Sequence, residues 1–236
     1  MKTKLIFLFL LFSGLTFSQN NSQATDDSST NIILTGSFSR AYRVAKSPEG
    51  LSPLFDEYVK DLKSGISFDL SGYYIYNKDK QRGIGLKYSL YNSKESLGPL
   101  LFTDNNTGNQ FSANISDDIN IVYFGPSYGS FKEVNDGKGI LKFELSMGYM
   151  GYKNIAYAPD FIKITGSSFG MSASLGYVLK LSNKVYFGPQ LSMIGGNLKS
   201  ITLQDSYGNK EVIKLSEENS ESLWRFDLSA NLLVKL

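Results

Sequence analysis

The 236-residue chain contains no cysteine and no histidine. Without cysteine it can form no disulfide, no thiol nucleophile and no zinc–thiolate site. Without histidine it cannot run Ser-His-Asp catalysis, which needs an imidazole to take the serine proton. No glycine-rich loop follows a strand and opens a helix, so a phosphate-binding site of that kind is also excluded. The sequence therefore predicts a protein that is not an enzyme and that holds no metal and no cofactor.

Long apolar runs are also scarce, and the clearest one lies near the N-terminus. Lys2 and Lys4 precede it, it covers residues 5–12, and Thr16-Phe17-Ser18 follows as a small-x-small cleavage site. This is the order of a secretory signal peptide, and the run is shorter than the ~20 apolar residues of a membrane-spanning helix. We predict a cleaved signal peptide over residues 1–18 and export of the protein, with an uncleaved N-terminal anchor as the alternative.

Strong net charge is absent once the signal is removed. Lys2 and Lys4 leave with it, so 22 of the 24 basic residues remain against 22 acidic residues. No basic stripe remains that could neutralise phosphates, which excludes nucleic acid as a partner. Residues 19–31 are polar and of low complexity, and we expect a disordered lead-in there. A single domain over residues 32–236 follows.

Proline is scarce, at 6 residues, whereas glycine reaches 22 residues and aromatic residues reach 14%. After the lead-in the chain reads as eight segments in which apolar and polar side chains alternate. A period of two residues is that of a β-strand. In the last segment, Leu233 alone breaks the alternation of the apolar set, which is Trp224, Phe226, Leu228, Ala230, Leu232, Val234 and Leu236. The predicted strands cover about residues 32–44, 65–76, 83–92, 119–131, 140–152, 168–181, 185–195 and 223–236.

Short and long connections alternate between these strands. The short ones are residues 77–82, 133–139 and 182–184, and the long ones are residues 45–64, 93–118, 153–167 and 197–222. This alternation places all the long connections on one rim, as in the barrels of outer membranes. The sequence therefore predicts an all-β fold, an eight-stranded antiparallel up-and-down transmembrane β-barrel with short periplasmic turns and long extracellular loops.

The two faces of the predicted strands differ in composition. One carries bulky Leu, Ile, Phe and Met, which suit acyl chains, and the other carries small residues and a few charges, which suit the narrow lumen of an eight-stranded barrel. Buried charges are generally paired, so we predict a charge network in the lumen. Its members are Asp69, Lys87, Lys142, Glu144, Lys180, Arg225 and Asp227. The carboxylates leave open an acid/base pair or a cation path. The alternative fold is a soluble secreted barrel or sandwich with its apolar face turned inward.

Aromatic girdles and three misfits complete the pattern. Arg40 lies on the apolar face, so we expect it near the rim, where its stem can reach the interface. Gly125-Pro126 and Gly188-Pro189 lie inside segments, although proline cannot donate to a strand ladder. We expect a bulge or bend at a rim there, or a break in the fourth strand. The residues expected in the girdles are Tyr42, Tyr76, Tyr88, Tyr91, Tyr149, Tyr177 and Trp224.

Two of the long connections contain further signals. Residues 54–62, LFDEYVKDL, have helical apolar spacing, which predicts a short helix that caps the mouth, presents a partner surface or only packs the loop. Glu217, Glu218 and Glu221 form an acidic cluster that could contact a divalent ion or lipopolysaccharide-bound calcium. A solvated acidic loop is the alternative interpretation.

The signal, the loop rhythm and a final strand that keeps its parity to Leu236 are typical of one group of proteins. The chain resembles the small eight-stranded outer-membrane β-barrels of Gram-negative bacteria, of the OmpA/OmpX type, often described as the outer membrane protein β-barrel domain. The resemblance covers about residues 32–236. It implies an outer-membrane location, with lipid, lipopolysaccharide and the barrel-assembly machinery as partners. The chain departs from the family's sorting signal in ending on Leu236 rather than on an aromatic residue.

Members of that group are structural, adhesive or accessory to secretion, and the lipid-modifying and protease members use the histidine that this chain lacks. We therefore expect a non-enzymatic protein that contributes to envelope integrity or binds an extracellular partner through its long loops. Three alternatives remain open at this point. They are a narrow porin-like channel for small solutes, a soluble secreted ligand-binding barrel, and a hydrolase that uses carboxylates.

Overall fold

The computed structural model describes residues 31–236, apart from residues 46–49, 51, 78, 80, 104–107, 159 and 217–219. The predicted signal peptide and lead-in lie outside the described residues, except for Asn31, whose carbonyl oxygen accepts a hydrogen bond from the Ile75 N–H at 2.8 Å. The elements are β1 (Ile32–Arg43), α2 (Pro53–Lys63), β2 (Ser64–Asn77), β3 (Arg82–Thr103), β4 (Gln110–Val134), β5 (Gly139–Tyr157), β6 (Phe161–Lys180), β7 (Val185–Leu198), β8 (Ser200–Gln204), β9 (Lys210–Lys214), β10 (Glu221–Ser222) and β11 (Arg225–Lys235).

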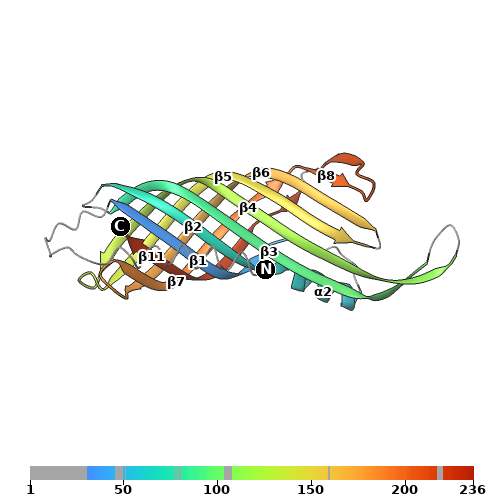
Figure 1. Cartoon of the computed structure of the whole chain (residues 1–236), viewed down its shortest axis with the longest axis horizontal. Helices are drawn as coiled ribbons and strands as arrows, with labels where there is room; N and C mark the ends of the chain where they lie inside the picture. The colour runs from blue at the N-terminus through green and yellow to red at the C-terminus, as the bar shows by residue number, and fades with distance from the viewer. Residues whose placement is uncertain are drawn as a thin grey trace.

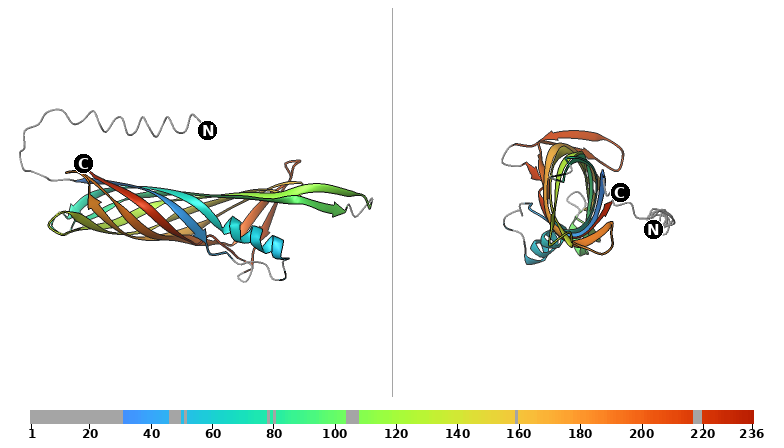
Figure 2. Two further views of the ribbon diagram at one scale, coloured as in Figure 1. Left: turned by 90° about the horizontal axis from the view of Figure 1, so that it is seen from below. Right: turned by 90° about the vertical axis from the view of Figure 1, so that its left-hand side faces the viewer.

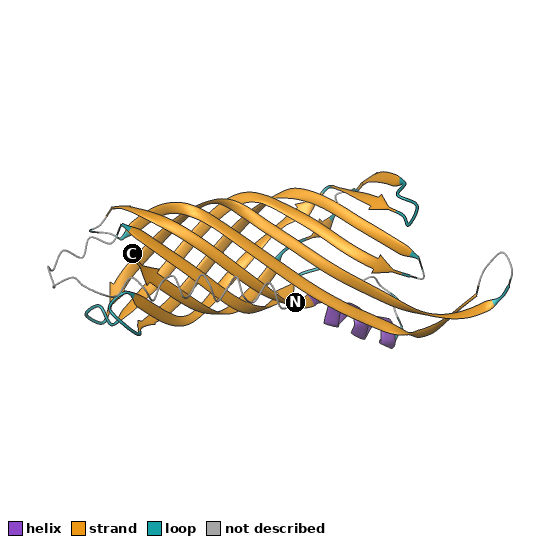
Figure 3. Cartoon of the chain, in the orientation of Figure 1, coloured by secondary structure: helices purple, strands orange, loops and turns teal. Residues whose placement is uncertain are grey.

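Eight of the strands close into an antiparallel barrel (Figures 1 and 3). β1 to β6 each pair with the next strand in the chain, and β11 joins β7 to β1. Closure leaves no free edge in the barrel wall, so every strand of the wall has a hydrogen-bonding partner on both sides. The predicted eight-stranded up-and-down barrel is confirmed. The short strands are additions at one end, where β8 pairs with β6, β9 with β8 and β10 with β7.

The apolar side chains lie on the outer wall of this barrel. In β11 the exposed fraction is 64% for Leu228 and 0% for its neighbour Asp227. The same alternation of exposed and buried residues runs through most of the wall, as in β1, β2 and β5. A contiguous apolar surface of this size marks contact with a membrane. The alternative with the apolar face inward is therefore wrong, and the barrel is of the transmembrane type.

The apolar band of the outer wall ends in a polar row on the side of the long connections. In register across β1 to β5 this row contains Arg40, Asn92, Asn120 and Lys153, with the apolar Ile66 of β2 between Arg40 and Asn92. Arg40 thus lies at the border of the band, as expected, and its Nε donates to Ser64 Oγ at 2.9 Å. On β3 the apolar outward residues stop at Leu90, one outward position before the row. The strands therefore continue well past the part that contacts hydrocarbon.

Two of the predicted long loops are wrong, because strand structure replaces them. Residues 93–118 are mostly the outer parts of β3 and β4, which pair as far as Thr103 and Gln110. Residues 153–167 are mostly the ends of β5 and β6, which pair as far as Tyr157 and Phe161. Their Ser, Asn and Asp residues indicated loops from the sequence, but pairing between neighbouring strands satisfies the backbone there. The longest hairpin, β3–β4, projects beyond the rest of the barrel (Figure 1).

The remaining connections lie where the sequence predicts them, although short strands form within the last long one. The predicted helix over residues 54–62 is confirmed as α2, and residues 197–222 contain β8, β9 and β10. The short connection between β4 and β5 is a tight turn in which Asn135 and Asp136 both have φ of 53° and Gly137 has φ of 79°. Asn and Gly tolerate this left-handed conformation better than other residues do. No helix in the described part of the chain is long and apolar enough to cross a membrane.

The two Gly-Pro sites neither bulge nor break their strands, so both expectations for them are wrong. In β4 the pairing with β5 omits two rungs and resumes in the same register at Ser127, and in β7 the pairing with β6 resumes at Phe187. Proline has no N–H to donate, and the omitted pairs lie where its hydrogen bond would otherwise form. A Cβ on Gly125 would lie 2.2 Å from the Met147 carbonyl oxygen, and one on Gly188 would lie 2.1 Å from the carbonyl oxygen of Tyr177. Glycine is therefore required where the two strands approach closely.

Candidate functional site

A layer of paired charges lies in the middle of the lumen. Six of the seven predicted network residues are buried there, and they comprise three cations and three carboxylates, Lys87, Lys142, Arg225, Asp69, Glu144 and Asp227. Lys180 is the exception, because it lies exposed at the end of β6. The prediction for Lys180 is wrong, since the strand ends there and an inward position at the rim is open to water. The buried layer is therefore neutral in formal charge.

Glu144 joins side chains of three strands in this layer. The Lys142 Nζ lies 3.3 Å from its Oε2 and the Lys87 Nζ lies 3.9 Å from the same oxygen. The Tyr73 hydroxyl donates to the other oxygen, Oε1, at 2.8 Å. Lys87 also lies 3.9 Å from Asp69 Oδ2. These contacts connect β2, β3 and β5 across the lumen, so the charges hold the opposite walls together.

A second group links β11 to the same layer. The Arg225 Nε lies 3.2 Å from both carboxylate oxygens of Asp227, and Asp227 Oδ2 accepts from the Ser67 hydroxyl at 2.9 Å. The Arg225 Nη2 donates to Ser89 Oγ at 2.5 Å, and the guanidinium lies 5.4 Å from the centre of the Tyr91 ring. Each of the three buried carboxylates thus lies within 4 Å of a cation. This arrangement favours the charge network over an acid/base pair or a cation path.

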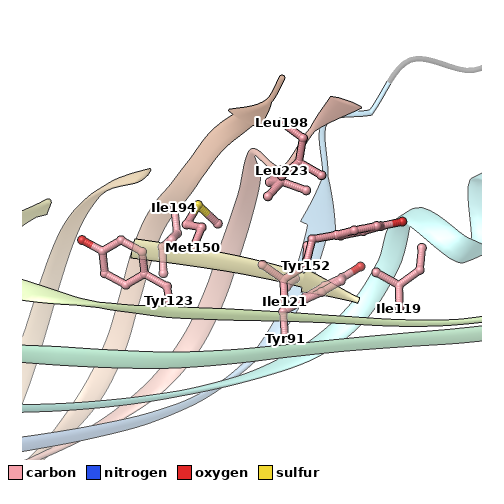
Figure 4. Packing of buried hydrophobic residues seen from close by; sticks show 10 residues of the cluster. Tyr91, Ile119, Ile121, Tyr123, Met150, Tyr152, Ile194, Leu198 and Leu223 are labelled. Carbon is pink, nitrogen blue, oxygen red and sulfur yellow. The ribbon is translucent and has the colours of Figure 1, made fainter. Parts of the chain in front are cut away.

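Apolar clusters close the lumen on both sides of the charged layer. The extracellular cluster, shown in Figure 4, contains Ala41, Tyr91, Ile119, Ile121, Tyr123, Met150, Tyr152, Ile194, Leu198 and Leu223. The periplasmic cluster contains Ile33, Tyr73, Ile75, Phe131, Ile140, Val178, Tyr186 and Leu233. Close packing of such clusters leaves little room for solutes. Side chains therefore fill the lumen in both clusters and in the charged layer between them.

The sequence reasoning missed these clusters. Tyr91 was expected in a girdle, but it points inward and is buried, because it shares the inward parity of Lys87 and Ser89. Two signals could have found the clusters. Leu233 breaks the alternation of the last strand, and it is buried in the periplasmic cluster. The mixed pattern of the fourth strand, with Ile121 beside Val122, reflects apolar side chains on both faces.

Helix α2 packs at the extracellular mouth of the barrel. Its Tyr58 hydroxyl donates to Asp117 Oδ2 on β4 at 2.5 Å, and the Asn154 amide of β5 donates to the other oxygen at 2.5 Å. The Ser93 hydroxyl of β3 donates to the Leu62 carbonyl oxygen at 2.6 Å. Burial, and then the hydrogen bond to Asp117, raise the pKa of Tyr58 well above its ordinary value. The helix is therefore fixed to residues of the inward face, which favours a cap on the mouth.

A short strap crosses the same end. The Arg43 Nη2 of β1 lies 2.7 Å from Glu221 Oε1 and donates to the Ser222 carbonyl oxygen at 3.4 Å, both in β10. Glu221 is the one member of the predicted acidic cluster that the structure describes, since Glu217 and Glu218 lie outside the described residues. In the described ranges no group of three or more metal-ligating side chains could hold an ion. The contact of Glu221 with Arg43 favours a structural role for this carboxylate.

The β3–β4 hairpin projects beyond the rest of the barrel (Figure 2). Its projecting part carries apolar side chains beyond the polar row. The register places six of them on the face that continues the inner wall, Leu97, Leu100, Phe102, Phe111, Ala113 and Ile115. The rings of Phe102 and Phe111 stack with centroids 5.7 Å apart, and Phe111 is 40% exposed. On the other face Leu101 is 78% exposed. The hairpin therefore offers exposed apolar side chains beyond the polar row.

No protein-family model and no curated protein matches the chain. Among solved structures, a major outer membrane protein from Thermus thermophilus is similar with a TM-score of 0.52 and 9% sequence identity, over 87% of this chain and 99% of that one. OprG from Pseudomonas aeruginosa gives a TM-score of 0.49 and 12% identity, over 87% and 96% of the two chains. The outer membrane protease OmpT from Escherichia coli gives 0.48 and 10%, over 92% and 99%. Identities this low show a shared fold alone, and the chain has the fold of the outer-membrane β-barrels.

Proposed function

We propose that the protein is a non-enzymatic outer-membrane barrel that presents its extracellular β-structure to a partner. The observation that supports this most is the filled lumen, in which two apolar clusters enclose a neutral layer of paired charges. A barrel filled in this way offers no wide path for solutes. The side chains that it exposes beyond the membrane lie on the extracellular extension, which includes the β3–β4 hairpin. Rigid scaffolds that position exposed segments commonly serve binding.

The absence of histidine from the whole chain supports a role without catalysis. The imidazole base of the serine-type mechanisms is missing. The buried carboxylates, which could act in its place, are held by lysine and arginine side chains at 3.2 to 3.9 Å. A general base must instead be able to reach a substrate proton. Envelope integrity is the simplest non-catalytic role that a filled barrel fulfils even without a partner.

Reconstitution in planar lipid bilayers tests the proposal against a channel. We expect the purified protein to insert without steady conductance, because side chains fill the lumen. Stable unitary currents from the full chain would overturn the proposal and favour the porin-like alternative.

A photoreactive amino acid tests the binding role on intact cells. Placed at Leu101, which is 78% exposed on the hairpin, it should yield crosslinked protein adducts. The matched control is Leu228, which is 64% exposed but lies on the lipid-facing wall. Protein adducts at Leu228 and none at Leu101 would contradict a hairpin that meets a partner.

A further inference from the structure

The outer wall of β1 to β4 contains a recess at the extracellular border of the apolar band. Its volume is about 200 Å³. Outward-facing side chains line its sides, namely Phe38, Ile66, Phe68, Leu90 and Val122. Asn92 and Asn120 lie at its extracellular end, in the polar row that borders the band. The recess is therefore apolar along its length and polar at one end.

The polar end is a built cluster rather than a scatter of side chains. Asp118 Oδ1 accepts from the Asn120 amide at 2.8 Å and from the Asn92 amide at 3.0 Å. The Asn92 Nδ2 also lies 3.2 Å from Asn120 Oδ1. All three side chains are partly buried, although they face outward from a wall that is otherwise apolar. Hydrogen-bonding groups thus lie where the acyl region of a bilayer meets its headgroups.

Three outward-facing cations lie on the strands around the recess. Lys94 is the register partner of Asp118, and Lys153 is the register partner of Asn120. Arg40 is the register partner of Ile66, which lines the recess. All three cations are exposed. Three positive charges against the single carboxylate of Asp118 favour an anionic group over a neutral one, because opposite charges attract across the interface.

We propose that this recess is a specific site for an anionic, phosphate-bearing membrane lipid. One acyl chain occupies the apolar part between Phe38 and Val122. The Asn92 and Asn120 amides face the ester and headgroup region, and the surrounding cations attract the phosphate. The occupant follows from position, since the recess opens on the lipid-facing wall and acyl chains are what that wall contacts. The site is independent of the extracellular partner proposed above.

Native mass spectrometry of lipid retained by the purified full chain tests this site. The protein is reconstituted in vesicles of equal parts phosphatidylglycerol and phosphatidylcholine and then extracted with mild detergent. We expect the wild-type protein to retain phosphatidylglycerol in preference to phosphatidylcholine. Leu90→Trp fills the recess with an apolar side chain that the membrane tolerates, and it should lower retention about tenfold, because each buried methylene adds to lipid affinity.

Two further variants separate the acyl part of the site from its charge. Leu175→Trp makes the same change at a 53% exposed position on β6, away from the recess, and should retain as much lipid as the wild type. Lys153→Gln should reduce the preference for phosphatidylglycerol while phosphatidylcholine retention stays the same. Heat-modifiable gel migration verifies that each variant is folded. Equal retention by wild type and Leu90→Trp, or equal retention of the two lipids by the wild type, would overturn the proposal.

Discussion

The Tyr58 hydroxyl of α2 donates a hydrogen bond of 2.5 Å to Asp117 of β4. This contact joins the helix in the first extracellular connection to the wall of the longest hairpin, 59 residues later in the chain. Asp117 also accepts from Asn154 of β5, so one carboxylate connects three elements at the mouth. The order of the extracellular end therefore depends on a small number of polar contacts.

Tyr58→Phe should loosen α2 without unfolding the barrel. A hydrogen bond to a charged group contributes about 1.5–3 kcal/mol, and its loss affects only the local opening of the helix. Hydrogen exchange should accelerate in α2 and remain unchanged in β1, β2 and β11. Tyr207→Phe is the control, because Tyr207 is 90% exposed. Equal acceleration in the barrel strands would contradict a local role.

Alkaline pH should leave this contact intact after exposed tyrosines have ionised. The folded protein raises the pKa of Tyr58 above the usual 10.0, first through burial and then through the bond to Asp117. Because the folded pKa of Tyr58 is raised, its contribution to stability is complete below the unfolded pKa and is lost as pH rises through the folded pKa. Ultraviolet titration near pH 10 should therefore give the same phenolate signal for the wild type and for Tyr58→Phe. A smaller signal from the variant would show that Tyr58 ionises normally.

Glu144→Gln should destabilise the barrel more than Lys142→Met. Removing Glu144 leaves Lys142 buried without its carboxylate, and breaking a buried pair costs about 3–5 kcal/mol. Removing Lys142 leaves Glu144 with Lys87 and Tyr73, so the cost is smaller. Urea-dependent unfolding from lipid vesicles measures the difference. Lys184→Met, at an exposed turn, is the control. Equal losses of unfolding free energy in Glu144→Gln and Lys142→Met would contradict the prediction.

Gly188→Ala should impair barrel closure. Its Cβ would lie 2.1 Å from the Tyr177 carbonyl oxygen of β6, and overpacking costs about 1–3 kcal/mol or more. Gly36→Ala is the matched control, because the nearest atom to its Cβ is 3.9 Å away. The fraction of heat-modifiable protein after refolding compares the two. Normal refolding of Gly188→Ala would show that the strands can separate there without cost.

The sequence predicted the barrel because apolar and polar side chains alternate where one face of a strand meets lipid and the other meets the charged lumen. Leu228 and Asp227 lie on opposite sides of the wall, as their parity requires. The same alternation predicted the buried charges of the lumen, except that Lys180 is exposed at the end of its strand. The prediction was incomplete where both faces of a strand carry apolar side chains. Ile121 is as apolar as the outward residues around it, although it fills the lumen.

The length of the strands could not be read from the sequence for a related reason. Outside the membrane both faces of a hairpin contact water or other protein, so apolar alternation is no longer needed. Residues 93–103 and 110–118 therefore have the composition of a loop although they form a paired ladder. The spacing of residues also could not predict the contacts of α2 with Asp117 and Ser93, because these depend on how the helix packs against strands distant in sequence.

The β3–β4 ladder continues from the bilayer to Thr103 and Gln110 with one register shift, between Leu97 and Leu100. Eleven residues beyond Asn92 extend about 36 Å at the ~3.3 Å rise of a strand. A contact site at that distance is already ordered before anything touches it. Recognition through this ribbon would then lose less conformational entropy than recognition through a flexible loop, and its strength would depend on the stiffness of the barrel below.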